Sequence, residues 1–203
     1  AKELIARTLT RVNADGLLVG EGGGVDIGYN LGQTIGFLAL YARLTDDEAL
    51  LTRAATLLEA HLPFVYPNGL IDNSWGTRSY KWTYESGTKT APGVPFTFEL
   101  LAERDARFAA AAQRTREYLL NHALVDDWVV QGPHASRRTS AYPPCLYGTF
   151  ARAQSLAMAV AHRASAEPVP VTDPDESPPW IRHFPSVQVA VVRTGGLMAT
   201  VAA

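Results

Sequence analysis

Residues 31–62, LGQTIGFLALYARLTDDEALLTRAATLLEAHL, carry the pattern that decides the fold. Over residues 31–44 the apolar side chains recur three or four positions apart, which is the spacing of one face of a helix. Thr45 and Glu48 then have the spacing of a capping box, which predicts that a new helix begins there. That second helix, over residues 47–62, has a leucine-rich face of its own. The stretch therefore predicts two helices joined by a short turn.

The same pattern returns about 60 residues later. Residues 96–103 predict another apolar helix. Residues 106–121 predict an amphipathic helix that follows it, with Asp105 as the N-terminal cap. The solvent-exposed side of this second helix is expected to carry Gln113, Arg114, Arg116 and Glu117. Leu40-Tyr41-Ala42 in the first pair corresponds to Leu100-Leu101-Ala102 in the second. Repeated two-helix units indicate an array of α/α hairpins.

The last third of the chain changes character. Residues 147–163 predict an alanine-rich helix that is apolar on nearly every side, including Phe150 and Val160, as in the interior of a bundle. Residues 166–179 are rich in proline and acidic side chains and predict a linker. Residues 180–203 predict a β-hairpin. We therefore expect a mainly α fold, with a helical domain over residues 1–165 followed by the first strands of a β domain, as a fragment would show.

Composition excludes several classes. The 203 residues are 47% apolar and 19% charged, which is typical of a globular protein. A net charge of −2 gives no footprint for nucleic acid or for an anionic membrane, and no apolar run reaches the ~20 residues of a membrane span. Cys145 is the single cysteine, and no histidines are closely spaced, so we expect neither a disulfide nor a metal nor another cofactor.

The segment Asp72–Thr90, DNSWGTRSYKWTYESGTKT, is the strongest indication of function. It combines aromatic rings with amide, guanidinium and hydroxyl groups, and it has no helical period. Aromatic faces that stack on sugar rings, beside polar groups that reach the hydroxyls, are what a carbohydrate cleft requires. The alternative is a polar loop whose aromatic residues only fix it to the fold. Gly20–Gly24 lacks the ending of a phosphate loop, and we interpret it as a flexible loop facing a substrate.

The order of helical hairpins, acidic linker and strands resembles the polysaccharide lyases of the heparinase II/III and alginate lyase type. The resemblance lies in Gly28-Tyr29-Asn30-Leu31-Gly32-Gln33, in Asp72–Arg78 with Tyr80-Lys81-Trp82, and in Phe184–Ala199. It implies an incomplete α/α toroid with an antiparallel β-sandwich, an acidic polysaccharide as the partner, and a periplasmic or secreted location. The chain departs from that family in two ways: Ser74 follows Asn73 where many members have histidine, and only about three hairpins are expected.

β-Elimination at a uronic acid needs a neutralised carboxylate, a base for the C5 proton and an acid for the departing O4. Amide and guanidinium groups suit the first task, while tyrosine or histidine suits the others. The candidate catalytic residues are Asn73, Arg78, Tyr80, Tyr84, His134 and Tyr142. The candidate substrate-binding residues are Tyr29, Asn30, Trp75, Lys81, Trp82, Arg137 and Arg138. Each also has a purely structural interpretation, as an ion pair, a turn residue or a core anchor.

Two other functions stay open at this point. A glycoside hydrolase would need two carboxylates flanking the bond, which Glu21, Asp26, Asp72 and Glu85 could supply. A non-catalytic glycan-binding domain would use the same aromatic residues with an incomplete catalytic set. We interpret His61, His122 and His162 as structural residues near helix ends, where a cation is mildly stabilising, and we assign His183 to the linker.

Overall fold

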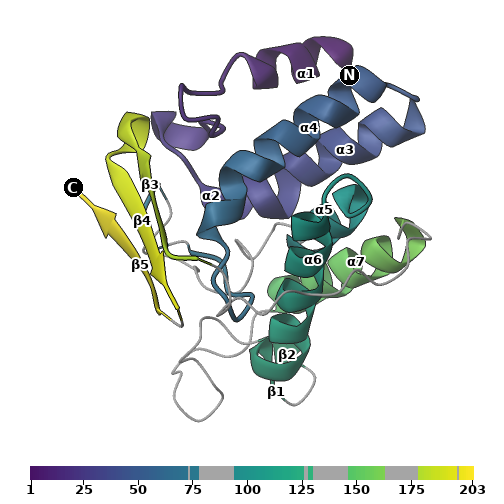
Figure 1. Cartoon of the computed structure of the whole chain (residues 1–203). Helices are drawn as coiled ribbons and strands as arrows, with labels where there is room; N and C mark the ends of the chain where they lie inside the picture. The colour runs from purple at the N-terminus through teal and green to yellow at the C-terminus, as the bar shows by residue number, and fades with distance from the viewer. Residues whose placement is uncertain (73, 78–93, 126–127, 130–145, 163–177, 196) are drawn as a thin grey trace.

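The computed structural model describes residues 1–72, 74–77, 94–125, 128–129, 146–162, 178–195 and 197–203. In this part of the chain a group of helices is followed by a three-stranded antiparallel sheet, which lies along one side of them (Figure 1). The predicted fold class, mainly helical with an antiparallel sheet at the end, is therefore confirmed. The predicted linker at residues 166–179 lies almost wholly outside the described residues.

The elements follow one another in a simple order. The α-helices are α1 (Lys2–Leu9), α2 (Ile27–Tyr29), α3 (Ile35–Leu44), α4 (Glu48–His61), α5 (Val94–Leu101), α6 (Ala106–Tyr118) and α7 (Leu146–His162). The strands are β1 (Leu124–Val125), β2 (Trp128–Val129), β3 (Trp180–Phe184), β4 (Val189–Thr194) and β5 (Leu197–Ala202). Asn30–Thr34 and Leu119–Ala123 form π-helical turns. None of the helices in the described ranges is long and apolar enough to cross a membrane.

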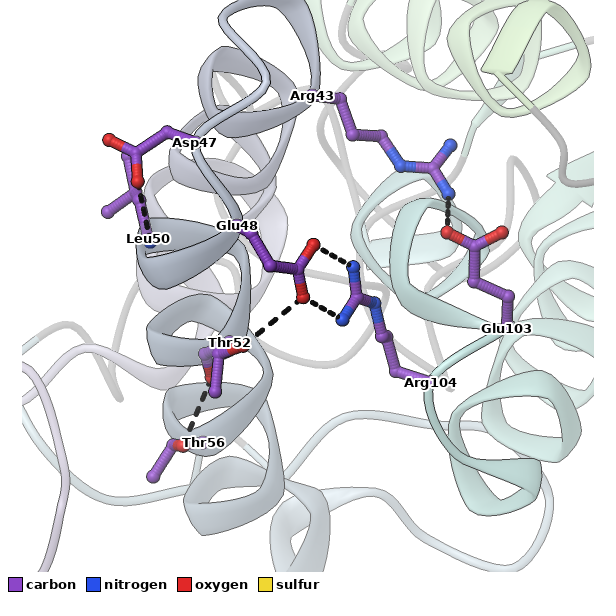
Figure 2. Close-up of polar contacts among 8 residues, drawn as sticks. All are labelled: Arg43, Asp47, Glu48, Leu50, Thr52, Thr56, Glu103 and Arg104. Carbon is purple, nitrogen blue, oxygen red and sulfur yellow. Dashed lines mark hydrogen bonds and ion pairs between the residues drawn. The ribbon is translucent and has the colours of Figure 1, made fainter.

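The two predicted hairpins form and pack together. Helix α3 contacts α4 and α5, and α5 contacts α6. Figure 2 shows the reciprocal ion pairs between their turns: Arg43 to Glu103 at 2.5 Å, and Arg104 to both carboxylate oxygens of Glu48 at 2.5 and 2.7 Å. The hydrogen bonds from Arg104 lower the pKa of Glu48. Because these side chains lie at the surface, the pairs align the hairpins more than they stabilise them.

The predicted capping box at Thr45 is wrong by two residues. Helix α4 begins at Glu48, and Asp47 Oδ1 accepts the Leu50 N–H at 3.0 Å (Figure 2). The Thr45 hydroxyl instead donates to the Tyr41 carbonyl at 2.8 Å, within the end of α3. Asp46 adopts a left-handed φ of 51°, so the chain turns there before the new helix can start.

The prediction that α7 is buried on all sides is also wrong. Phe150 is 66% exposed and Val160 is 79% exposed, whereas Arg152 and Ser155 are buried. Helix α7 packs on α5, where the Ser155 hydroxyl accepts the Phe96 N–H at 3.2 Å. Small side chains let two helices approach closely, so α7 turns its serine, and not its large apolar residues, toward its neighbour.

The C-terminal sheet has the order β3-β4-β5. Thr194 pairs with Leu197 across a two-residue loop, which confirms the predicted hairpin. Strand β3 adds a third strand, and His183 lies in it opposite Ala190, so its assignment to the linker is wrong. Phe184 is buried and packs on Phe64, with ring centroids 4.7 Å apart, which joins the sheet to the helical core.

Replacement of Asp47 tests the observed cap. We expect Asp47→Ala to lower the free energy of unfolding by about 1 kcal/mol, because the Leu50 N–H at the start of α4 loses its side-chain acceptor. Thr45→Ala, the matched control, removes only an exposed hydroxyl and should change stability by less than about 0.5 kcal/mol. Urea unfolding followed by circular dichroism measures both. A larger loss of unfolding free energy for Thr45→Ala than for Asp47→Ala would show that Thr45 caps the helix and would contradict the observed cap.

Candidate functional site

Two loops meet where the polar segment begins. The Val25 carbonyl accepts the Thr77 N–H at 3.0 Å and the Thr77 hydroxyl at 3.3 Å. A Cβ added at Gly24 would lie 2.4 Å from the Thr77 methyl group, and one at Gly76 would lie 2.3 Å from the Val25 oxygen. Gly76 also has a φ of +87°, which favours glycine. Gly24 and Gly76 therefore permit the close contact between the two loops, and the Gly-rich loop packs against the start of the polar segment.

Asp72 anchors the other end of this segment. Its carboxylate is fully buried and accepts the Ser74 N–H at 3.1 Å and the Ser74 hydroxyl at 2.6 Å. Its second oxygen accepts a hydrogen bond from the Thr200 hydroxyl of β5. The Asp72 N–H donates to the Phe64 carbonyl at 2.8 Å. Because a buried carboxylate is costly unless it is hydrogen-bonded, these contacts fix the loop between the helices and the sheet.

Trp75 lies in the core and not on an open surface. Its side chain is only 7% exposed, and its ring packs on Phe64 with centroids 5.0 Å apart. Phe64 in turn contacts Phe184, so the three rings form one layer between the helices and the sheet. The indole N–H is buried and makes no hydrogen bond within the described ranges. The Trp75 ring thus anchors the polar segment, which matches the structural alternative for this residue.

Asn30 and His61 form a buried polar pair under the site. Asn30 Nδ2 donates to the Leu18 carbonyl at 2.9 Å and lies 3.0 Å from His61 Nε2. His61 Nδ1 lies 2.7 Å from the Leu57 carbonyl, which can only accept. The imidazole therefore carries its proton on Nδ1 and accepts from the amide through Nε2. The Asn30 amide hydrogens are used inside the protein, and its predicted contact with a substrate stays a prediction.

His61 is uncharged at neutral pH. Burial lowers its pKa from 6.5 to about 4; the bond to the Leu57 carbonyl opposes this shift, and the nearby Arg182 adds to it. A buried cation without a counter-charge would be costly, so the neutral form is the stable one. His61 is a structural residue, but the interpretation as a helix-terminal cation is wrong.

Tyr29 is held directly beside this pair. Asp26 Oδ1 accepts the Tyr29 N–H at 2.8 Å, and the π-helical turn begins at the next residue. The Thr97 hydroxyl donates to the Leu31 carbonyl at 2.5 Å, so the wide turn is held from α5. π-Helical turns are frequent at functional sites. Tyr29 is half-buried and thus has a fixed backbone and a partly accessible side chain.

Two members of the predicted carboxylate set also have structural roles. Asp26 caps α2 and Asp72 holds the loop, and both are buried. The side chain of Glu21 and all of Glu85 lie outside what the structure describes. Among the described residues, no three histidine, cysteine, aspartate or glutamate side chains are grouped to hold a metal ion.

The other predicted site residues lie outside the described ranges. They follow the anchored segment or belong to the second polar loop: Asn73, Arg78, Tyr80, Lys81, Trp82, Tyr84, His134, Arg137, Arg138 and Tyr142. Their predicted roles stay predictions. The described geometry adds the anchors Asp72, Thr77 and His61. The sequence could not have identified these anchors as a group, because their partners are distant in the chain.

Comparison with known proteins gives the class. Residues 1–176 match the family model described as the ulvan lyase N-terminal domain. The chain is 36% identical over 182 residues to a broad-specificity ulvan lyase of Formosa agariphila, covering 89% of this chain and 28% of that protein. The chain therefore belongs to the ulvan lyase N-terminal domain family, and it spans less than a third of this curated relative. No solved structure matches it.

This membership confirms the resemblance to polysaccharide lyases at the level of the broad class. The narrower resemblance, to the heparinase II/III and alginate lyase type, stays a prediction. The same holds for the toroid and the β-sandwich.

The buried histidine predicts a pH dependence of stability. Above pH 6.5 both the folded and the unfolded chain hold this imidazole neutral. Below pH 6.5 the imidazole is protonated in the unfolded chain, whereas in the folded chain it stays neutral until about pH 4. The free energy of unfolding therefore falls as the pH is lowered from 6.5 to 4, by up to roughly 3 kcal/mol. Urea unfolding at pH 7, 6, 5 and 4.5 measures it. His61→Gln should show a flatter profile, and an identical profile would contradict the assignment.

Proposed function

We propose that the chain belongs to a polysaccharide lyase that cleaves an acidic, uronate-containing polysaccharide by β-elimination, with ulvan as the first candidate. Membership of the ulvan lyase N-terminal domain family is the observation that carries this proposal. The name of the Formosa relative supports ulvan as the substrate. The mainly helical fold with a sheet at its end does not by itself define the chemistry, so the proposal depends on the family membership.

The anchored segment supports a role for the residues that follow it. Thr77 is fixed to Val25, and Asp72 is fixed to Thr200, so the chain reaches Arg78 from a held position. Pre-organised side chains bind and catalyse at a lower entropic cost than mobile ones. We propose that this segment carries the clamp for the uronate carboxylate, with Arg78 as its cation and Asn73 as its neutral donor.

The remaining steps need proton transfer. In β-elimination a base takes the C5 proton, the electron pair forms the C4–C5 double bond, the C4–O4 bond breaks, and an acid protonates O4. We assign these transfers to Tyr80, Tyr84, His134 and Tyr142. Binding of the sugar rings is assigned to Tyr29, Lys81, Trp82, Arg137 and Arg138. The domain limits at residues 165 and 180, and a periplasmic or secreted location, belong to the same proposal.

The hydrolase alternative is not favoured. A glycosidase needs two carboxylates that face the scissile bond. Asp26 accepts the Tyr29 N–H, and Asp72 accepts bonds from Ser74 and Thr200, so both have structural roles in the folded chain. A binding domain without catalysis would bind the polymer but form no product, so an assay for product distinguishes it from the lyase.

The direct test follows ultraviolet absorbance at the wavelength of the C4–C5 double bond. The full-length protein is incubated with ulvan, alginate, heparan sulfate, chondroitin sulfate and pectate. We expect the absorbance to rise with ulvan, and Tyr84→Phe or Arg78→Ala to lower kcat/KM about a hundredfold or more. Arg53→Ala, which changes an exposed arginine of α4, should retain full activity.

Three other results would contradict the proposal. A flat trace with every polymer, from folded protein, would contradict β-elimination of these substrates. New saturated reducing ends would indicate a hydrolase. A polymer-dependent rise in melting temperature without product would indicate a binding domain.

A further inference from the structure

Strand β5 forms an open edge of the C-terminal sheet. The strand order is β3-β4-β5, and within the described ranges β5 pairs with β4 alone. In Figure 1 this strand lies on the outer side of the sheet, beside the C-terminus. Because the hydrogen-bonding groups of a strand point alternately to its two sides, every second residue of β5 directs its backbone N–H and C=O away from β4. Such a row of groups is a template for a further strand.

The two edges of this sheet differ in how they are protected against pairing. Proteins commonly block an edge with charged side chains, prolines or bulges. Strand β3, at the other edge, contains the exposed Arg182 and directly follows Pro178 and Pro179. Strand β5 has the sequence LMATVA, without a charge or a proline, and its six consecutive pairs with β4 contain no bulge. The β5 edge is therefore the one that is open to a partner.

The side chains of β5 make this edge apolar. Leu197 and Val201 lie on one face of the sheet and are 65% and 61% exposed. Ala199 lies between them on the same face and is also exposed. On the opposite face the Thr200 hydroxyl donates to Asp72, which fixes the orientation of the strand. An apolar edge without charge suits another apolar strand and offers nothing to an acidic polymer.

We propose that β5 pairs with β5 of a second copy of this chain, antiparallel about a twofold axis, so that two three-stranded sheets become one six-stranded sheet. A twofold contact joins the same surface of both copies, so this surface must match itself.

Strand β5 matches itself when Ala199 lies at the axis. Leu197 of one copy then lies opposite Val201 of the other, and the exposed apolar side chains share one face of the joined sheet. These cross-strand apolar pairs are favourable, and no like charges meet within β5. The proposal concerns assembly and does not depend on the proposed function.

Sedimentation velocity of the whole chain over a range of concentrations tests the assembly. We expect a monomer–dimer equilibrium with a micromolar Kd, because one strand pair is smaller than a standard interface. Ala199→Lys places two ammonium groups directly opposite each other and should raise Kd about fivefold or more. Ala153→Lys, the same change at an exposed position of α7, should leave Kd unchanged.

A disulfide at the axis tests the register of the two strands. In a Cys145→Ser background, Ala199→Cys introduces the only thiol. The two Cα atoms at position 199 should lie about 4.5–5.5 Å apart, which a disulfide can span. Mild oxidation should therefore give a covalent dimer on non-reducing gels. Ala190→Cys, on β4, should stay monomeric, because its counterpart lies at least three strand spacings away, about 14 Å.

Several outcomes would overturn the proposal. One is a monomer at every concentration. Another is a dimer whose Kd is the same in Ala199→Lys, or equal cross-linking through positions 199 and 190, since either result places the contact elsewhere. Assembly beyond a dimer would also contradict it, because a twofold contact closes on itself. Melting temperatures show that the variants are folded, and the mass of the wild type decides the question without any variant.

Discussion

A buried carboxylate governs the centre of this molecule. Asp72 has no solvent exposure, so its charge is tolerable only where hydrogen-bond donors surround it. Ser74 supplies two donors from the same loop, and Thr200 supplies one from the last strand, 128 residues further along the chain. Asp72 therefore ties the loop directly to the last strand, so a shift of one disturbs the other.

Aromatic packing completes the same junction. Phe64 leads out of α4 and lies between Trp75 of the polar segment and Phe184 of β3. The layer joins three parts of the sequence that secondary structure alone would leave separate. It also explains how a segment rich in polar groups can have a fixed start, because its first aromatic ring is used for anchoring. The rings that remain for sugar binding are then expected later in the segment.

His61 and Asn30 form a second buried constraint, and Asn30 directly follows Tyr29 in the chain. The neutral imidazole accepts from the Asn30 amide, and that amide also reaches the Leu18 carbonyl. The turn that carries Tyr29 is thus tied to α4 and to the preceding loop. The pair therefore contributes to the candidate site by fixing the position of this turn, and it brings no charge.

The sequence predicted the helices and the C-terminal hairpin well, because their periodicity is local. It failed where the outcome depends on distant partners. Thr45 and Asp47 are both good caps, and only the left-handed Asp46 decides between them. The exposed apolar face of α7 could not be predicted, since periodicity does not reveal which side a neighbour covers.

The candidate site was predicted as a segment but not as a geometry. The composition of the polar segment marked it as unusual, yet it left open whether Trp75 stacks on a sugar or anchors the segment in the core, where the structure places it. The 31-residue separation of Asn30 and His61 hid their pairing in the same way.

A double-mutant cycle between Asp72 and Thr200 tests most directly whether this junction holds the loop and the sheet together. The free energies of unfolding of wild type, Asp72→Ala, Thr200→Val and the double variant are measured in urea at pH 7. If the buried bond couples the loop and the sheet, the sum of the two single-variant losses in unfolding free energy should exceed the loss in the double variant by about 1–3 kcal/mol. Additivity within about 0.5 kcal/mol would show that the loop and the sheet are held independently, and it would contradict the central role of Asp72.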